Sequence, residues 1–212
     1  MTYHNNDSYT GTWEADKKHG LGFVKYANGA SYSGEFVHGR KEGQGKLHFS
    51  NGDVYQGGWL DGKKNGLGSY WWADGAVFEG NYVNGKKEGN GKIVYNNGDI
   101  YVGELVDSKR EGHGEEHWIN GEHYVGQYKA GKRHGKGKCT FADGSVYEGE
   151  YVADEKSGHG LFVSKSTRYD GEWSNGRWDG RGTLTERNKP PITGLWRKGK
   201  LVEAKKAREE EQ

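Results

Sequence analysis

The feature that most limits the folds open to this chain is a set of aromatic residues at a fixed interval. The leading aromatics are Tyr9, Tyr32, Tyr55, Phe78, Tyr101, Tyr124 and Tyr147, each 23 after the last by subtraction of the residue numbers, and then Tyr169, 22 later. A period of this size held over several copies is the signature of a repeat architecture. We therefore expect one small unit stacked on itself instead of a conventional domain.

Each unit is predicted to form two short strands. The first strand has the pattern of Tyr55-Gln56-Gly57-Gly58-Trp59, in which the two aromatics and the first glycine share one face because successive side chains alternate. A glycine inside a strand is costly unless something approaches closely, so we expect it to open a slot for a ring from the neighbouring strand. A polar loop, a Gly-x-Gly pair and a second alternating run follow, and an Asn-Gly or Asp-Gly dipeptide, typical of tight hairpins, ends the unit.

Composition supports an ordered but thin molecule. Only 31% of the residues are hydrophobic, below the roughly 45–50% of globular domains, whereas the 13% of aromatic residues argues against disorder. No segment with helical periodicity is available to cover the sheet. We predict an all-β fold, an elongated single-layer twisted antiparallel β-meander of repeat hairpins with a short C-terminal helix.

The repeat also predicts the boundaries. Residues 1–8 form a partial leading half repeat, 9–192 hold eight repeats starting at 9, 32, 55, 78, 101, 124, 147 and 169, and 193–200 are a partial ninth. Residues 201–212 are a charged tail with helical i,i+4 pairing of lysine and glutamate. A leading half repeat would expose an open sheet edge, through which the chain could self-associate.

The rings expected to form a structural ladder share the two aromatic positions of the first strand. They are Tyr9, Trp13, Tyr32, Phe36, Tyr55, Trp59, Phe78, Tyr82, Tyr101, Tyr124, Tyr128, Tyr147, Tyr151, Tyr169 and Trp173.

Several classes of function find no support. The net charge of +1 provides no drive toward nucleic acid, and no apolar run approaches the ~18 residues of a transmembrane segment. The single cysteine, Cys139, cannot form an internal disulfide, and no secretory leader is apparent, so a cytoplasmic location is the default.

Two patterns resemble ligand sites but are interpreted as structural. The segment from Gly85 to Lys92 is similar to a phosphate-binding loop, but it has five residues between its glycines where that loop has four. His113, His117 and His123 fall in one repeat. The last two could face one another near a turn, so a metal site is one interpretation of this pattern. Solvated strand histidines are the simpler interpretation. We expect no metal, no cofactor and no catalytic residues, and hence no enzyme.

Pairs of basic residues have the most functional content, because the period stacks them along one edge of the sheet. This candidate partner-binding edge comprises Lys17, Lys18, Arg40, Lys41, Lys63, Lys64, Lys86, Lys87, Lys109, Arg110, Lys132 and Arg133. Acidic protein surfaces or anionic lipid would be its natural partners. The alternative is that the pairs are solvated turns whose charge prevents edge-to-edge aggregation.

The consensus Tyr-x-Gly-x-aromatic, Gly-x-Gly and Asn/Asp-Gly, over roughly residues 1–200, resembles the membrane occupation and recognition nexus (MORN) repeat family. That family includes radial spoke components of cilia, junctional membrane proteins, plant lipid kinases and scaffold proteins of protist cytoskeletons. The resemblance implies a non-catalytic scaffold that binds other proteins of a cytoskeletal assembly, in the axoneme or radial spoke of a cilium or flagellum. The alternative is a peripheral membrane protein that binds anionic phospholipid through the basic edge.

Overall fold

The computed structural model describes residues 6–204, and every regular element in that range is a β-strand. The chain divides into two compact units, residues 1–109 and 110–212. The all-β antiparallel fold predicted from the sequence is confirmed, since consecutive strands within each unit pair antiparallel. A helix able to cross a membrane is not found in the part of the chain that the structure describes.

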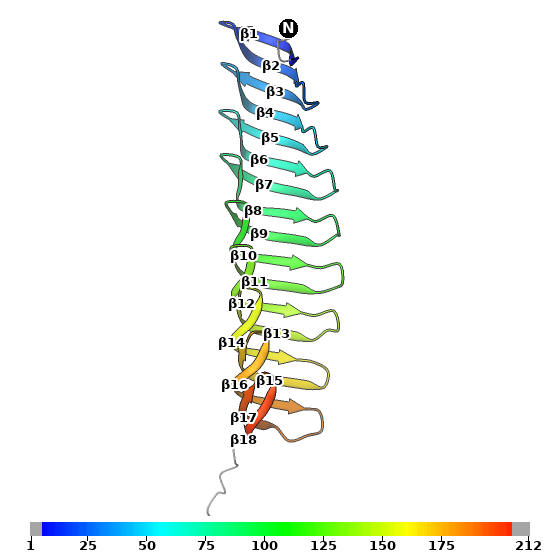
Figure 1. Ribbon diagram of the computed structural model, residues 1–212, viewed down its shortest axis with the longest axis vertical. Coiled ribbons are helices and arrows are strands. Elements are labelled where there is room, and N and C mark those ends of the chain that lie inside the picture. The colour runs from blue at the N-terminus through cyan, green and yellow to red at the C-terminus, as the bar shows by residue number, and fades with distance from the viewer. Residues whose placement is uncertain (1–5, 205–212) are drawn as a thin grey trace, which may run out of the picture. The chain divides into compact units, whose positions relative to one another are not determined.

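The first unit is a meander of hairpins in chain order (Figure 1). Its strands are β1 (Ser8–Glu14), β2 (Lys17–Lys25), β3 (Ser31–Val37), β4 (Arg40–His48), β5 (Val54–Leu60), β6 (Lys63–Trp71), β7 (Val77–Val83), β8 (Lys86–Val94) and β9 (Ile100–Val106). Each strand pairs with its sequence neighbour.

The second unit repeats this arrangement. Its strands are β10 (Lys109–His117), which begins at the unit boundary, β11 (His123–Lys129), β12 (Lys132–Thr140), β13 (Val146–Val152), β14 (Glu155–Val163), β15 (Thr167–Ser174), β16 (Arg177–Glu186), β17 (Ile192–Arg197) and β18 (Lys200–Ala204). They also pair in sequence order.

The predicted C-terminal helix over 201–212 is wrong for the residues that can be described. Residues 201–204 lie in β18, where Leu201 is opposite Trp196 and Glu203 is opposite Leu195. The unpaired edge of β17 offers this segment backbone hydrogen bonds that a short isolated helix could not match in stability. The rest of the predicted helix lies outside the described residues.

The tightest turns precede the basic pairs. At Asp61 and Gly62 both central residues have positive φ, 50° and 77°, the signature of a two-residue type I′ hairpin. The sequence placed a polar loop here, whereas in the structure Lys63 already begins β6. The basic pairs are therefore the first residues of strands.

The Asn-Gly dipeptides instead lie in longer connections, which corrects the expectation of two-residue turns there. Tyr26 N–H donates to the Ala30 carbonyl over 2.9 Å, and Gly29 N–H donates to the Tyr26 carbonyl over 3.0 Å. The Asn28 side chain accepts the Ala30 N–H at 3.0 Å. Such an Asx turn mimics a backbone turn and holds the longer loop closed.

A row of glycines crosses each unit and makes room for the leading aromatics. In the first unit the row runs Gly11, Gly22, Gly34, Gly45, Gly57, Gly68, Gly80, Gly91 and Gly103, each paired with the next. A Cβ on Gly68 would lie 2.5 Å from the Tyr55 hydroxyl. The expected slot exists, and Tyr55 covers Gly57 of its own strand as well as Gly68 of the next.

The aromatics pack edge to face in a zigzag. Tyr32 contacts Phe36 of its own repeat at 5.2 Å between ring centroids and Trp59 of the next repeat at 5.3 Å, both nearly perpendicular. In the second unit Tyr147 makes the same two contacts with Tyr151 and Trp173. Such pairs contribute about 0.5–1.5 kcal/mol each beyond their burial, so the ladder connects successive repeats.

The structure places most of the ladder rings in the core. All of those named above except Trp13 are buried, and Trp13 is 41% exposed. Leu105, also buried, stands where the fifth repeat would have its second aromatic. The core is therefore one ring deep and lies on a single side of the sheet.

Candidate functional site

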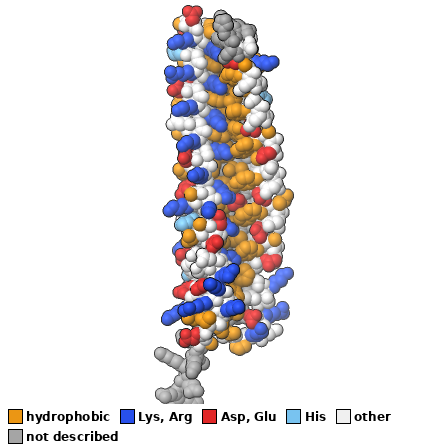
Figure 2. Space-filling view, viewed as in Figure 1, with side chains coloured by type: hydrophobic (Ala, Val, Ile, Leu, Met, Phe, Trp, Pro, Cys, Tyr) orange, Lys and Arg blue, Asp and Glu red, His pale blue; other side chains and the backbone are white. Residues whose placement is uncertain are grey.

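The side of the sheet that carries the leading aromatics is called the inner face. Beside the buried rings it bears a second line of half-buried aromatic side chains, which stand just before or at the longer connections that end the repeats. These are Tyr26, Phe49, Tyr70, Trp72 and Tyr95 in the first unit, and Trp118, Phe141 and Phe162 in the second. Figure 2 shows hydrophobic side chains gathered in a band, with Lys and Arg beside them.

The first member of each basic pair is exposed at the edge of the sheet. Arg40 pairs with Asp61, and Lys86 pairs with Asp107, so part of this edge is neutralised by the next repeat. Lys17, Lys63, Lys109 and Lys132 are exposed as well. The expected basic edge consists of these first members alone.

The second member of each pair turns onto the inner face and lies among aromatic rings. The Lys41 amine is 4.7 Å from the centroid of Trp59, 4.9 Å from Tyr32 and 5.5 Å from Tyr26. The Lys64 amine lies 4.6 Å from Tyr70. Ammonium groups at these distances are attracted by the negative faces of the rings.

Further cations repeat this arrangement. Lys87 lies 4.2 Å from the Trp72 ring and Lys18 lies 5.3 Å from the Tyr9 ring. In the second unit Lys156 lies 4.6 Å from Phe141, and the Arg133 guanidinium lies 5.2 Å from Tyr151. In the eighth repeat Trp178 takes the place of the cation and stacks on Tyr169 at 4.5 Å.

The fifth repeat has Arg110 where other repeats have the inner-face lysine, and Glu116 where they have an apolar residue. Arg110 donates to Glu116 over 2.5 Å, and Tyr128 donates to the other Glu116 oxygen over 2.9 Å. Glu116 is buried although the pattern predicts an apolar residue there. A buried carboxylate is tolerable only when it is paired and hydrogen-bonded, and both conditions are met.

Burial alters the protonation of the inner-face lysines. Loss of hydration lowers the pKa of Lys41 and of Lys87 to about 8, and it also lowers the pKa of Lys64 and Lys156. The aromatic faces act in the opposite direction because they favour the charged amine. No carboxylate of the described residues lies within ion-pair distance of these four amines.

Several carboxylates have roles that the sequence did not reveal. Asp53 is buried and accepts the Tyr70 hydroxyl at 2.6 Å and the Ala73 N–H at 2.9 Å. Those hydrogen bonds lower its pKa. Glu88 accepts the Asp107 N–H at 2.9 Å. These acids connect one repeat to the next. Glu88 recurs as Glu42 and Glu111, which make the same contact, so its signal was the period, whereas Ala30 and Ala76 stand at the positions equivalent to Asp53.

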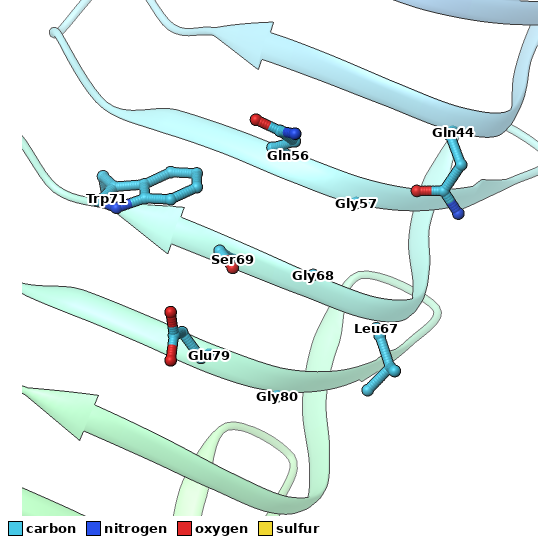
Figure 3. Close-up of a pocket in the computed structure, with 9 residues that line it drawn as sticks. All are labelled: Gln44, Gln56, Gly57, Leu67, Gly68, Ser69, Trp71, Glu79 and Gly80. Carbon is cyan, nitrogen blue, oxygen red and sulfur yellow. The ribbon is translucent and has the colours of Figure 1, made fainter.

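The opposite, outer face is more polar and shallow. Figure 3 shows a hollow in the first unit, where Gln56, Ser69, Trp71 and Glu79 project around the bare backbone of the glycine row. Leu67, 76% exposed, stands at its rim. The hollow is open, and it lacks the cations of the inner face.

The outer face of the second unit brings together two of the histidines that the sequence singled out. His117 is opposite His123 across β10 and β11, and their rings stack at 4.1 Å. Glu115, which the sequence did not suggest, contacts both. His113 is not among the three side chains whose donor atoms converge there.

Comparison with solved structures finds one fold of the same kind and weaker matches. The wild-type TCP10 domain of Danio rerio CPAP matches with a TM-score of 0.51 and 11% identity, over 98% of this chain and 99% of that one. The TCP domain of Drosophila melanogaster SAS-4 (dCPAP), in complex with a proline-rich motif of Ana2, matches with a TM-score of 0.40 and 13% identity, over 88% and 90%. At 11% identity, the similarity to the TCP10 domain of CPAP concerns the fold alone.

Sequence comparisons give a more specific result. Comparison with curated proteins found no match. The MORN repeat model matches residues 9–31, 32–54, 55–77, 78–100, 101–123, 124–146, 147–166 and 169–185. These segments begin at the eight leading aromatics, so the model recognises the same ring and glycine pattern that builds the ladder. The chain belongs to the MORN repeat family.

Proposed function

We propose that the protein is a non-catalytic scaffold that binds other proteins, and that its inner face holds an extended acidic segment of a partner. The observation that carries this proposal is the line of half-buried amines at Lys41, Lys64 and Lys87. They are surrounded by rings and have no carboxylate of the described chain within ion-pair distance, although the buried Asp53 acts on Lys64 from further away. A partner's carboxylates would supply the missing counter-charge in a partly desolvated setting, where ion pairs are stronger than in water.

The aromatic line beside the amines suits the same ligand. Tyr26, Phe49 and Trp72 recur once per repeat and are half-buried, so a side chain laid between two of them would bury apolar area on both. Trp and Tyr are among the residues that most often dominate the binding energy of protein interfaces. A segment that alternates acidic and apolar residues would match the two lines.

The cellular setting is proposed from the family. We place the protein in the cytoplasm, within a cytoskeletal assembly, with the axoneme or radial spoke of a cilium as the specific site. The TCP10 domain of CPAP, which shares the fold, has been solved with a peptide of STIL. That binding belongs to the other protein, and the proposal for this chain rests on the chemistry of its own inner face.

Anionic phospholipid is the alternative ligand, because Lys17, Arg40 and Lys63 are exposed along one edge. Arg40 is already paired with Asp61, which reduces the charge available to a membrane. Flotation with vesicles containing phosphatidylserine separates the two proposals. Flotation of the protein with these vesicles that is lost on substitution of the edge residues, but not of the inner-face lysines, would favour lipid over a protein partner.

An array of acidic and aromatic peptides tests the proposed function. The best binder is then titrated calorimetrically into the wild type and into the triple variant Lys41→Met, Lys64→Met and Lys87→Met, in which the apolar stems remain. The matched control, Lys25→Met, Lys46→Met and Lys92→Met, removes the same charge from exposed positions on the outer face. We expect at least tenfold weaker binding for the inner-face variant alone. Equal losses in both variants, or no binder in the array, would refute the proposal.

A further inference from the structure

We propose that Glu115, His117 and His123 form a binding site for a divalent transition-metal ion such as Zn²⁺ on the outer face of the second unit. The Glu115 Oε1 atom lies 2.8 Å from His117 Nε2 and 2.7 Å from His123 Nε2. One donor atom from each side chain lies within 4.8 Å of the other two. Three donors thus converge on one point.

The strand pairing fixes this convergence. His117 and His123 are direct partners across β10 and β11, and Glu115 precedes His117 by two residues, so all three project from the same face. The two imidazole rings are parallel to within 8°, and both Nε2 atoms contact the same Glu115 Oε1 atom. An imidazole nitrogen binds a metal ion in the plane of its ring, so the stacked rings would rotate about their side-chain bonds for both Nε2 atoms to reach one ion at about 2.0–2.1 Å.

The site is accessible, and the residues that pair with Glu115 on β11 and with His123 on β12 are uncharged. The three side chains are 45%, 50% and 35% exposed, in sequence order. Val125 lies opposite Glu115, and Thr140 lies beside His123 on β12. An ion could therefore enter from solvent and keep open coordination positions for water or for a ligand from another molecule.

Comparison among the repeats shows that the pair departs from the pattern. The equivalent cross-strand pairs are Lys25–Ser31, His48–Val54, Trp71–Val77, Val94–Ile100, Thr140–Val146 and Val163–Arg168. Packing at this position thus needs no histidine on either strand. Imidazole with carboxylate is a donor set that suits Zn²⁺, Cu²⁺ or Ni²⁺.

A second histidine cluster, with Glu14, also places one donor atom of each of its three side chains within 4.8 Å of the other two. His19 and His38 in the first unit have their ring centroids 5.7 Å apart at 64°, with Glu14 2.9 Å from His19. Its carboxylate contact is with His19, whereas in the first cluster one Glu115 oxygen contacts both histidines. This cluster therefore provides an internal comparison.

Calorimetric titration of the full chain, without an affinity tag, with Zn²⁺ tests the inference. We expect one site, weakened at least tenfold by His117→Gln and by His123→Gln. His48→Gln is the matched control, since His48 has the same strand position but faces Val54, and it should leave the affinity unchanged. Circular dichroism of the variants checks that the fold is retained.

Imidazole NMR signals provide a second readout. Zn²⁺ should shift the resonances of His117 and His123 at one equivalent, before those of His19 and His38. Absence of Zn²⁺ binding, or binding that persists in both His117→Gln and His123→Gln, would overturn the inference. Loss of binding in His19→Gln alone would do the same.

Discussion

At the scale of single residues, the leading tyrosine connects three features of the repeat. Its ring covers the glycine row, and its hydroxyl donates to a carbonyl three residues later, as Tyr55 does to Gly58 over 2.9 Å. That carbonyl lies where the strand register shifts, between Gly57 and Trp59. Burial raises the pKa of Tyr55 to about 12. The hydroxyl therefore stays protonated and satisfies a carbonyl that the ladder leaves free.

Removing this hydroxyl should therefore destabilise the protein. Tyr55→Phe should lower the free energy of unfolding by about 0.5–1.5 kcal/mol, the net value of one hydrogen bond. Tyr82→Phe is the comparison, because the buried Tyr82 hydroxyl lacks a hydrogen-bond partner among the described residues. Its removal should be neutral or stabilising. Urea denaturation measures both, and equal losses would contradict the role assigned to Tyr55.

The ring and glycine positions were predictable at this scale because each recurs with the period. The direction of the second basic residue was not. A Lys-Lys pair looks the same in sequence whether both amines are solvated or one lies on the Trp59 ring, as Lys41 does. The direction of the second lysine is set by the strand pairing, which begins at the first lysine. The geometry of the preceding turn, more than the composition, determines where that pairing begins.

At the scale of elements, the two kinds of connection have different chemistry. The two-residue turns need positive φ at both positions, which Asp61-Gly62 and Asn84-Gly85 supply. The Asn-Gly loops need it only at glycine and use the asparagine side chain as an acceptor. The sequence predicted a reversal of the chain at both connections. It assigned the tight turn to the Asn-Gly loop instead of the turn before the basic pair, because Asn-Gly suits either geometry.

The turn assignment predicts the effect of a Cβ at Gly62. Its φ of 77° is left-handed, and Gly62→Ala should cost about 1–2 kcal/mol although a Cβ there would meet no atom within 4 Å. Lys63→Ala, at the next and exposed position, should change stability by less than about 0.5 kcal/mol. Thermal denaturation compares the two. An unaffected Gly62→Ala variant would show that the turn is not held in this conformation.

At the scale of the whole molecule, the inner face of each unit buries the large rings beside amines, whereas other apolar side chains such as Trp71 are exposed on the outer face. The period sufficed to predict the sheet, the ladder and the family. It could not predict the Glu115 contact with two histidines, because that cluster depends on a departure from the repeat and on the register of β10 and β11.

The lowered lysine pKa values predict how stability changes with pH. In the unfolded chain a lysine keeps its proton to about pH 10.4, whereas burial lowers the pKa of Lys41 and Lys87 to about 8 in the fold. The unfolded state therefore binds more protons between these values, and the free energy of unfolding should rise as the pH increases from about 8 to 10.

Urea denaturation across that range provides the check. The double variant Lys41→Met and Lys87→Met should flatten the rise, since methionine has no proton to release. Above about pH 10, ionisation of tyrosines in the unfolded chain reverses the trend, because burial raises the pKa of Tyr55 and Tyr169 to about 12. Stability that falls between pH 8 and 10 would contradict the burial of these amines.

The most direct test of the inner face as a binding site is the number of protons taken up with an acidic peptide. A carboxylate placed beside Lys41 and Lys87 should raise their pKa from about 8, so binding near pH 8 should take up protons. Calorimetry in two buffers of different ionisation enthalpy measures this uptake. We predict net uptake in the wild type and in the outer-face control, and none in the inner-face triple variant. Binding without uptake, or uptake that persists in that variant, would contradict the account.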